Sequence, residues 1–398
     1  MLGISRWTEE GGSYRTIQRF FSKKIIWDSL NWAIAKRILK KQKGAILIAG
    51  DATTVTKSGK TTFGLGRFFS SIYSRAVPGI AFQVLSLIDV RKRRSWPILI
   101  EQIIPKIKNE KPTIKEKEKP KRGRGRPKGS KNKNRRDVEL NREMIQVQIM
   151  IRRLLKLLKD TLTPIYFVYD GAFGNNAAVQ MTKRIGLHLI SKLKKNSALY
   201  FRWNGKYSGR GRHPMYGNRL DYNSIPDEYL KSDKTEGNIN SKTYQLELIH
   251  KKFVDALNIV IIHKTNLETG KRTWVVLFSS DLQLGWENLV DYYSLRFQIE
   301  FNFRDAKQHW GLEDFMVTKE QSVFNAANLS MFMVNVSQAM LPTSGEESTL
   351  DLKARYHGLR YAVEFFKMLP GNTESINIKQ LFERVSMLGR IHKERMVA

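Results

Sequence analysis

One carboxylate stands among cations at helical spacing late in the chain. Tyr293, Arg296, Glu300 and Lys307 follow one another at gaps of three, four and seven residues. In a single helix over 286–310 these side chains share one face, because each residue advances by about 100°. Such a face can be a solvated set of ion pairs, each worth about 0.2–0.5 kcal/mol. It can also be a site where Glu300 binds a metal ion while Arg296 and Lys307 bind phosphates.

The helix that must carry this face is well marked. Arg304 continues the charged face, and no Pro or Gly interrupts the helix before Gly311, which is placed to end it. An apolar stripe at steps of three and four adjoins the charged face. The stripe consists of Leu289, Tyr292, Leu295, Ile299, Phe303, Ala306 and Trp310. The pattern therefore predicts one continuous helix that is buried on one side.

Two further carboxylates each follow a short apolar run. The run 45–50 leads into Asp51, and the run 164–169 leads into Asp170. Continuous apolar runs of this length are typical of strands that are buried on both faces. We expect each aspartate to end such a strand, where it either caps a turn or faces a site.

Three carboxylates from separate elements can hold two divalent cations. One cation then activates water or a 3′-hydroxyl, and the other stabilises the leaving oxygen of an in-line phosphodiester displacement. Mg²⁺ suits oxygen ligands best, and Mn²⁺ is the expected substitute. Asp51, Asp170 and Glu300 are therefore the candidate metal ligands and catalytic residues.

The spacing of Tyr293, Arg296, Glu300 and Lys307 resembles the YREK signature of insertion-sequence transposases of the DDE superfamily, type-4 branch. The segment Asp-Gly-Ala-Phe at 170–173 resembles the second-aspartate motif of that family. The resemblance implies an RNase H-like mixed α/β sheet with flanking helices, and a mainly β insertion between the second Asp and the Glu. It also implies a DNA transposase that cuts inverted-repeat ends and joins them to target DNA, often through hairpin intermediates, as a homodimer on paired ends.

Two other functions use the same residues. The chain could be a DNA-binding regulator of transposase descent that does not cut, or a nuclease of the same fold that cuts without joining. Three mutually repelling carboxylates favour an active enzyme, since a silent protein has no physical need to keep them.

Net charge points to a polyanionic partner. The 398 residues include 69 Lys and Arg against 37 Asp and Glu, a formal net charge of +32. Double-stranded DNA is the first candidate partner, and an anionic membrane surface is the second. No apolar run approaches the length of a membrane span. The chain has no cysteine, which excludes disulfides and thiolate zinc sites and fits a cytoplasmic, nucleoid-associated protein.

A polybasic segment supplies much of this charge. Residues 106–136 hold 15 Lys and Arg against three Glu, a net charge of +12. With so few apolar residues the segment cannot bury a core, and we expect it to be disordered without DNA. Arg124-Gly-Arg126-Pro127 resembles the centre of an AT-hook, whose arginines enter the minor groove of A·T-rich DNA. The alternative is a solvated linker that attracts DNA nonspecifically.

Other basic residues are candidate DNA contacts. Arg15 and Arg19 lie in a segment that resembles the recognition half of a helix-turn-helix, although an ordinary amphipathic helix fits equally well. Lys57 and Lys60 flank Gly59, where exposed backbone and cations could contact phosphates.

Composition divides the chain into five expected regions. They are a helical DNA-binding-like unit at 1–43, the first part of an RNase H-like core at 44–196 with the polybasic insert, a β-rich insertion at 197–285, the second part of the core with the catalytic helix at 286–341, and a helical C-terminal region at 342–398.

Overall fold

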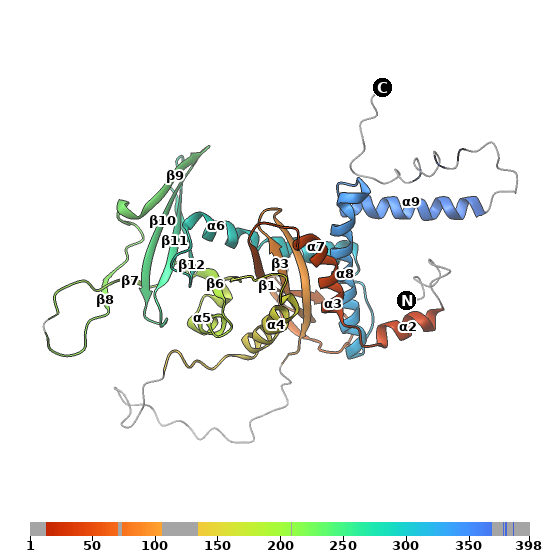
Figure 1. Cartoon of the computed structure of the whole chain (residues 1–398), viewed down its shortest axis with the longest axis horizontal. Helices are drawn as coiled ribbons and strands as arrows, with labels where there is room; N and C mark the ends of the chain where they lie inside the picture. The colour runs from red at the N-terminus through yellow and green to blue at the C-terminus, as the bar shows by residue number, and fades with distance from the viewer. Residues whose placement is uncertain are drawn as a thin grey trace, which may run out of the picture.

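The computed structural model describes residues 13–70, 74–105, 134–207, 209–367, 377, 379 and 385 (Figure 1). The AT-hook-like residues Arg124 and Arg126 lie outside this part of the chain. None of the helices within it is long and apolar enough to cross a membrane.

The centre of the molecule is a five-stranded mixed sheet. Strands β1 (Ile46–Thr56), β3 (Arg75–Asp89) and β4 (Arg94–Ile103) form an antiparallel meander. On the other edge of β1, strands β5 (Tyr166–Val168) and β6 (His188–Leu193) continue the sheet in parallel. The spatial order β4-β3-β1-β5-β6 is that of an RNase H-like fold, which confirms the predicted fold class.

The β-rich segment extends this sheet. Strand β12 (Arg272–Ser279) pairs antiparallel with β6, with Val276 opposite Leu193. The predicted hairpin of β11 (Leu257–Asn266) and β12 is present. The remaining strands continue outward or lie at the edges, and they are β10 (Ile239–His250), β9 (Leu230–Glu236), β7 (Leu199–Arg202), β8 (Tyr216–Arg219) and β2 (Gly66–Ser70). The insertion is therefore part of one sheet of twelve strands, and Figure 1 shows it reaching away from the centre.

Two apolar cores cover the two faces of the central sheet. Ile48 and Phe167 face a core with α3 (Trp27–Leu39), α4 (Arg142–Leu158) and α5 (Asn176–Lys183). Their chain neighbours Leu47 and Val168 face a second core, because successive side chains of a strand point to opposite faces. The helices of that second core are α6 (Trp286–Leu295), α7 (Gln298–His309) and α8 (Glu320–Ser344). Burial on both faces is what the apolar runs predicted.

The prediction of one continuous helix over 286–310 was wrong. The helix breaks between α6 and α7, where the amides of Arg296 and Phe297 donate to the carbonyls three residues earlier. These tighter bonds interrupt the 3.6-residue period. Leu295 and Ile299 both stay fully buried across the break, so the turn keeps the apolar stripe continuous. The predicted stop holds, since Gly311 has φ +72° just beyond α7.

The prediction that Asp51 ends its strand was wrong. β1 continues to Thr56 because β3 is 15 residues long and pairs with β1 as far as Gly79 opposite Thr56. The strand that ends near Asp51 is β5, on the other edge of β1, because β1 and β5 pair only up to Ala49 opposite Val168. The aspartate therefore lies where one edge of β1 becomes free.

A buried amide of α8 helps to fasten the N-terminal helices. Asn325 is fully buried, and its Nδ2 donates to the carbonyls of Phe21 and Lys23 at 2.8 and 2.7 Å. Its Oδ1 accepts from Trp27 Nε1 at 2.9 Å. Asn325 of α8 thus links helix α2 (Tyr14–Ser22) to α3.

We expect Asn325→Leu to lower the free energy of unfolding by about 3 kcal/mol, because the Trp27 indole and the carbonyls of Phe21 and Lys23 all lose their partner. Chemical denaturation measures the change. The matched control is Gln321→Leu, one turn earlier on α8, which removes only the half-buried hydrogen bond from Gln321 Nε2 to Asn325 Oδ1 at 3.2 Å and should cost less than about 1 kcal/mol. Equal losses in the two variants would contradict this role of Asn325.

Candidate active site

The fold brings the three predicted carboxylates together from distant parts of the chain. Asp51 lies within β1, Asp170 follows β5 by two residues, and Glu300 lies in the first turn of α7. The charges on Asp170 and Glu300 both act on Asp51 and raise its pKa. The acids thus form one electrostatic cluster at the point where the pairing of β1 and β5 ends.

A guanidinium group bridges two of these acids. Arg296 donates from Nη1 to Asp51 Oδ2 at 2.7 Å and from Nη2 to Glu300 Oε1 at 3.0 Å. Only 16% of its side chain is exposed. Burial lowers the pKa of Arg296, but the charges on Asp51 and Glu300 outweigh this effect and the net shift is upward. Arg296 lies in the turn between α6 and α7, and its bond to Asp51 joins this turn to β1.

Burial dominates the protonation of Asp51. It raises the pKa of the carboxyl group to about 6, against the opposing effects of Arg296 and of the Ala52 amide, which donates to Oδ1 at 2.8 Å. Asp170 has a different local role as well, because its Oδ1 caps the short helix η1 (Gly171–Phe173) by accepting from the Ala172 amide at 3.0 Å. One oxygen of each aspartate therefore serves its own backbone, as the capping alternative predicted.

The donor types of the cluster fit a divalent metal ion, since carboxylate oxygens are the ligands that hard cations prefer. The positions of these side chains fit a metal ion less well than their chemistry does. Within the described residues no three acidic or histidine side chains converge closely enough to hold a metal ion. The Arg296 guanidinium lies where a cation would contact both Asp51 and Glu300. A bound cation must therefore displace it from at least one carboxylate.

The other residues of the helical face are also engaged. The Tyr293 phenol is hydrogen-bonded with Arg296, and burial raises its pKa. Lys307 donates to the Thr54 carbonyl at 2.8 Å and pairs with Glu313 at 3.1 Å, so it ties α7 to β1. Arg304 is exposed and lies over the Phe301 ring.

The predicted DNA contacts outside this face have varied settings. Lys57 donates to the carbonyls of Glu313 and Phe315 at 2.9 and 2.7 Å, and burial lowers its pKa. It anchors a loop instead of standing free for phosphate. Lys60, Arg15 and Arg19 are exposed.

Sequence reasoning missed a polar network behind the acids. Glu143, in the first turn of α4, interacts with Asp170 and hydrogen-bonds Tyr169, and burial raises its pKa. The Tyr169 hydroxyl donates to Gln83 Oε1 at 2.9 Å, and Gln83 Nε2 donates to the Asp51 carbonyl at 3.0 Å. No local motif marks these residues, because each becomes significant only through its neighbours in the folded sheet.

Ser191 was also missed. It is buried near the end of β6, and its hydroxyl donates to the Asp170 carbonyl at 2.6 Å. The backbone there packs tightly, since a Cβ on Gly174 would lie 2.3 Å from the Lys192 carbonyl oxygen.

An RNase H-like sheet with acids gathered beside its central strand defines a class of nucleic-acid-cleaving enzymes. A family model of the DDE superfamily endonucleases matches residues 1–248, more than half of the chain, and the protein belongs to that family. The match contains Asp51 and Asp170 and ends before Glu300. A search among curated proteins gave no match. DDE endonucleases normally use divalent metal ions and act on DNA.

The raised pKa of Asp51 predicts a stability that depends on pH. Between pH about 4 and about 6 the folded state holds a proton on Asp51 that the unfolded state has released. Below this window the ionisation of Asp51 does not change the free energy of unfolding. As pH rises through the window, the free energy of unfolding falls, with a total loss on the order of 3 kcal/mol. We expect unfolding titrations across the window to show wild type losing stability relative to Asp51→Asn. A constant difference between the two proteins would contradict the raised pKa.

Proposed function

We propose that the protein is a DNA transposase of a bacterial-type insertion sequence, of the type-4 branch, which cuts phosphodiester bonds at transposon ends and joins them to target DNA. The observation that carries the proposal is the meeting of Asp51, Asp170 and Glu300 at one place on an RNase H-like sheet. Family membership supports the enzyme class. The spacing of the four signature residues supports the branch.

The three acids are the proposed ligands of two Mg²⁺ ions, with Mn²⁺ as a substitute. When bound, the ions supply activation of the attacking oxygen and stabilisation of the leaving oxygen. The protein holds the acids on separate rigid elements, β1, the cap of η1 and the start of α7. Asp51 must release its proton to bind a cation, and its pKa of about 6 allows that release near neutral pH.

Arg296 has two proposed roles, one in the metal-free site and one in the metal-bound site. Before a cation binds, it neutralises Asp51 and Glu300, whose charges would otherwise repel one another. With a cation held by these carboxylates, the Arg296 guanidinium would be available to bind a DNA phosphate, as the signature implies. Tyr293 and Lys307 adjoin this position from the same two helices.

Two alternatives keep the same fold. A nuclease would cut end DNA without forming strand-transfer products from a labelled end fragment. A regulator would bind the DNA and leave it intact.

The proposed assembly is a homodimer on paired ends, associated with DNA in the cytoplasm.

We expect Asp51→Asn, Asp170→Asn and Glu300→Gln each to abolish cleavage and strand transfer, a loss of at least about 100-fold, because charge stabilisation at the phosphate depends on both ions. DNA binding in a gel-shift assay should persist, since it rests on the basic surface.

Two aspartates outside the cluster are the controls. Asp281 accepts from the Tyr166 hydroxyl at 2.7 Å, and Asp305 is half-buried beside Arg304. Asp281→Asn and Asp305→Asn should cleave normally. Robust cleavage by any cluster variant, or a folded but inactive control, would overturn the assignment.

The counter-ion role of Arg296 makes a separate prediction. Arg296→Ala should bind Mg²⁺ or Mn²⁺ at least about tenfold more tightly without DNA, because a competing charge within a few ångströms is removed. Its cleavage activity should fall. Calorimetric titration well above the pKa of Asp51 measures the metal affinity. Lys307→Ala, whose ammonium group pairs with Glu313, is the control and should leave metal affinity unchanged. Weaker metal binding by Arg296→Ala would contradict competition.

A further inference from the structure

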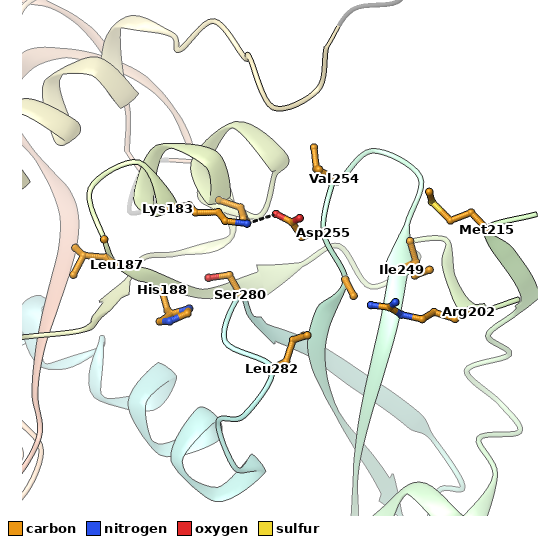
Figure 2. A pocket seen from close by; sticks show the side chains of 13 residues that line it. Lys183, Leu187, His188, Arg202, Met215, Ile249, Val254, Asp255, Ser280 and Leu282 are labelled. Carbon is orange, nitrogen blue, oxygen red and sulfur yellow. Dashed lines mark hydrogen bonds and ion pairs between the residues drawn. The ribbon is translucent and has the colours of Figure 1, made fainter. Parts of the chain in front are cut away.

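Two adjoining cavities lie between the β-rich segment and α5. The first, of about 620 Å³, is lined by Lys183, Arg202 and Asp255 among others, and Figure 2 shows these side chains around it. The second, of about 840 Å³, shares Met215 and Val254 with the first. Together they form one groove, hereafter the basic groove, that is open to solvent along the α5 side of the sheet.

The charges of the two cavities differ. In the first, Lys183 pairs with Asp255 at 3.0 Å, the contact drawn as a dashed line in Figure 2. The second is lined by Arg135, Arg136 and Arg212, and no carboxylate is among the residues that line it. Arg136 and Arg212 are exposed, and neither forms an ion pair with any residue that the structure describes. This part of the groove is a concave, uncompensated positive surface.

The backbone that carries Arg135 and Arg136 is held in place. The Arg135 guanidinium donates to the Lys251 carbonyl, and the Arg135 carbonyl accepts from Asn176 Nδ2 at 2.9 Å. The Arg136 carbonyl accepts from Arg184 Nη2 at 2.9 Å, and Asn176 Oδ1 accepts from the Val254 amide at 3.1 Å. Segment 134–136 is thus fixed to both ends of α5, so its cations are presented with little loss of conformational entropy on binding.

Aromatic rings line the neighbouring rim. Lys251 Nζ lies 4.6 Å from the centre of the Tyr200 ring and 5.7 Å from that of Tyr216. The centres of these two tyrosine rings are 5.6 Å apart. Cations beside rigid aromatic and hydroxyl groups are the combination that contacts the phosphates and sugars of nucleic acid.

The groove is also connected to the acid cluster. Asp170 caps η1, and α5 begins at Asn176, whose side chain holds both Arg135 and the 251–254 loop. The polybasic segment ends at the same place, since residues 106–136 carry a net charge of +12 and Arg135 and Arg136 are its last residues. The Asp170 cap and the Asn176 side chain that orders the basic groove are thus six residues apart along the chain.

We propose that the basic groove binds the phosphodiester backbone of duplex DNA on one side of the cleaved bond, with Arg136 and Arg212 as phosphate contacts. The inference rests on the proposed function only for the identity of the polyanion. It assigns the β-rich segment a direct part in holding the DNA, separate from the acids that act on it.

The test is the salt dependence of DNA affinity in the full chain. Fluorescence anisotropy with a labelled duplex of arbitrary sequence gives the slope of log affinity against log salt for wild type and for Arg136→Gln/Arg212→Gln. Each lost phosphate contact lowers the slope by about 0.9, so we expect the double variant to lose about 1.8. Arg136→Lys/Arg212→Lys keeps both charges and should retain most of the slope.

The matched control removes two cations from the opposite end of the β-rich segment. Lys234 and Lys271 are exposed near the tips of the β9–β10 and β11–β12 hairpins, whereas β10 ends beside β7 at the groove. Lys234→Gln/Lys271→Gln should change the slope by less than half as much. A change in the arginine double variant no larger than in this control, with both folded by thermal unfolding, would overturn the proposal.

Failure of the proposed function is distinguishable from failure of the groove. The groove is tested by binding to the uncleaved duplex, where Glu300→Gln should keep the wild-type slope. The transposase assignment is tested separately, by cleavage with wild type and with Glu300→Gln at saturating DNA. A normal slope in the arginine variant rejects the groove alone, and cleavage by Glu300→Gln rejects the proposed chemistry alone.

Discussion

The ion pair of Arg296 with Asp51 and Glu300 is the interaction on which the candidate site depends. Burial and mutual repulsion make the gathering of three carboxylates costly, as the raised pKa of Asp51 shows. A guanidinium at 2.7 and 3.0 Å from two of them offsets that cost without an added ion. Because the pair is mostly buried, loss of either partner leaves an uncompensated charge. Arg296 lies in the turn between α6 and α7, so this pair also joins the turn to β1.

The unequal lengths of neighbouring strands create the space for the cluster. β1 has 11 residues and β5 has three, so their parallel pairing stops at Ala49 and Val168. Beyond that point β1 is supported on one edge by β3 alone. Asp51 and Asp170 thus come from adjacent strands at a place where no further ladder bonds are possible. Ligand sites in α/β sheets commonly occur where the pairing of neighbouring strands ends in this way.

The continuous sheet gives the β-rich segment a fixed position relative to the acids. β12 pairs with β6, and β6 pairs with β5, whose end carries Asp170. The outer strands and the strands that carry the acids therefore belong to one hydrogen-bonded sheet. The proposed basic groove adjoins this sheet, α5 and the end of the polybasic segment.

The sequence by itself determined the sheet class and the end of α7 at Gly311, because burial on both faces and glycine conformation are local properties of the chain. It also marked Asp51, Asp170 and Glu300 as candidates, since two follow apolar runs and one shares a helix with cations. Only the tertiary structure decided that β1 runs past Asp51, since the length of β3 sets that limit. It alone decided that Arg296 pairs with the acids and that Lys57 anchors a loop. Only the tertiary structure likewise placed Glu143 and Gln83 beside the acids. Their contacts come from other strands and helices, and spacing along one helix carries no information about such contacts.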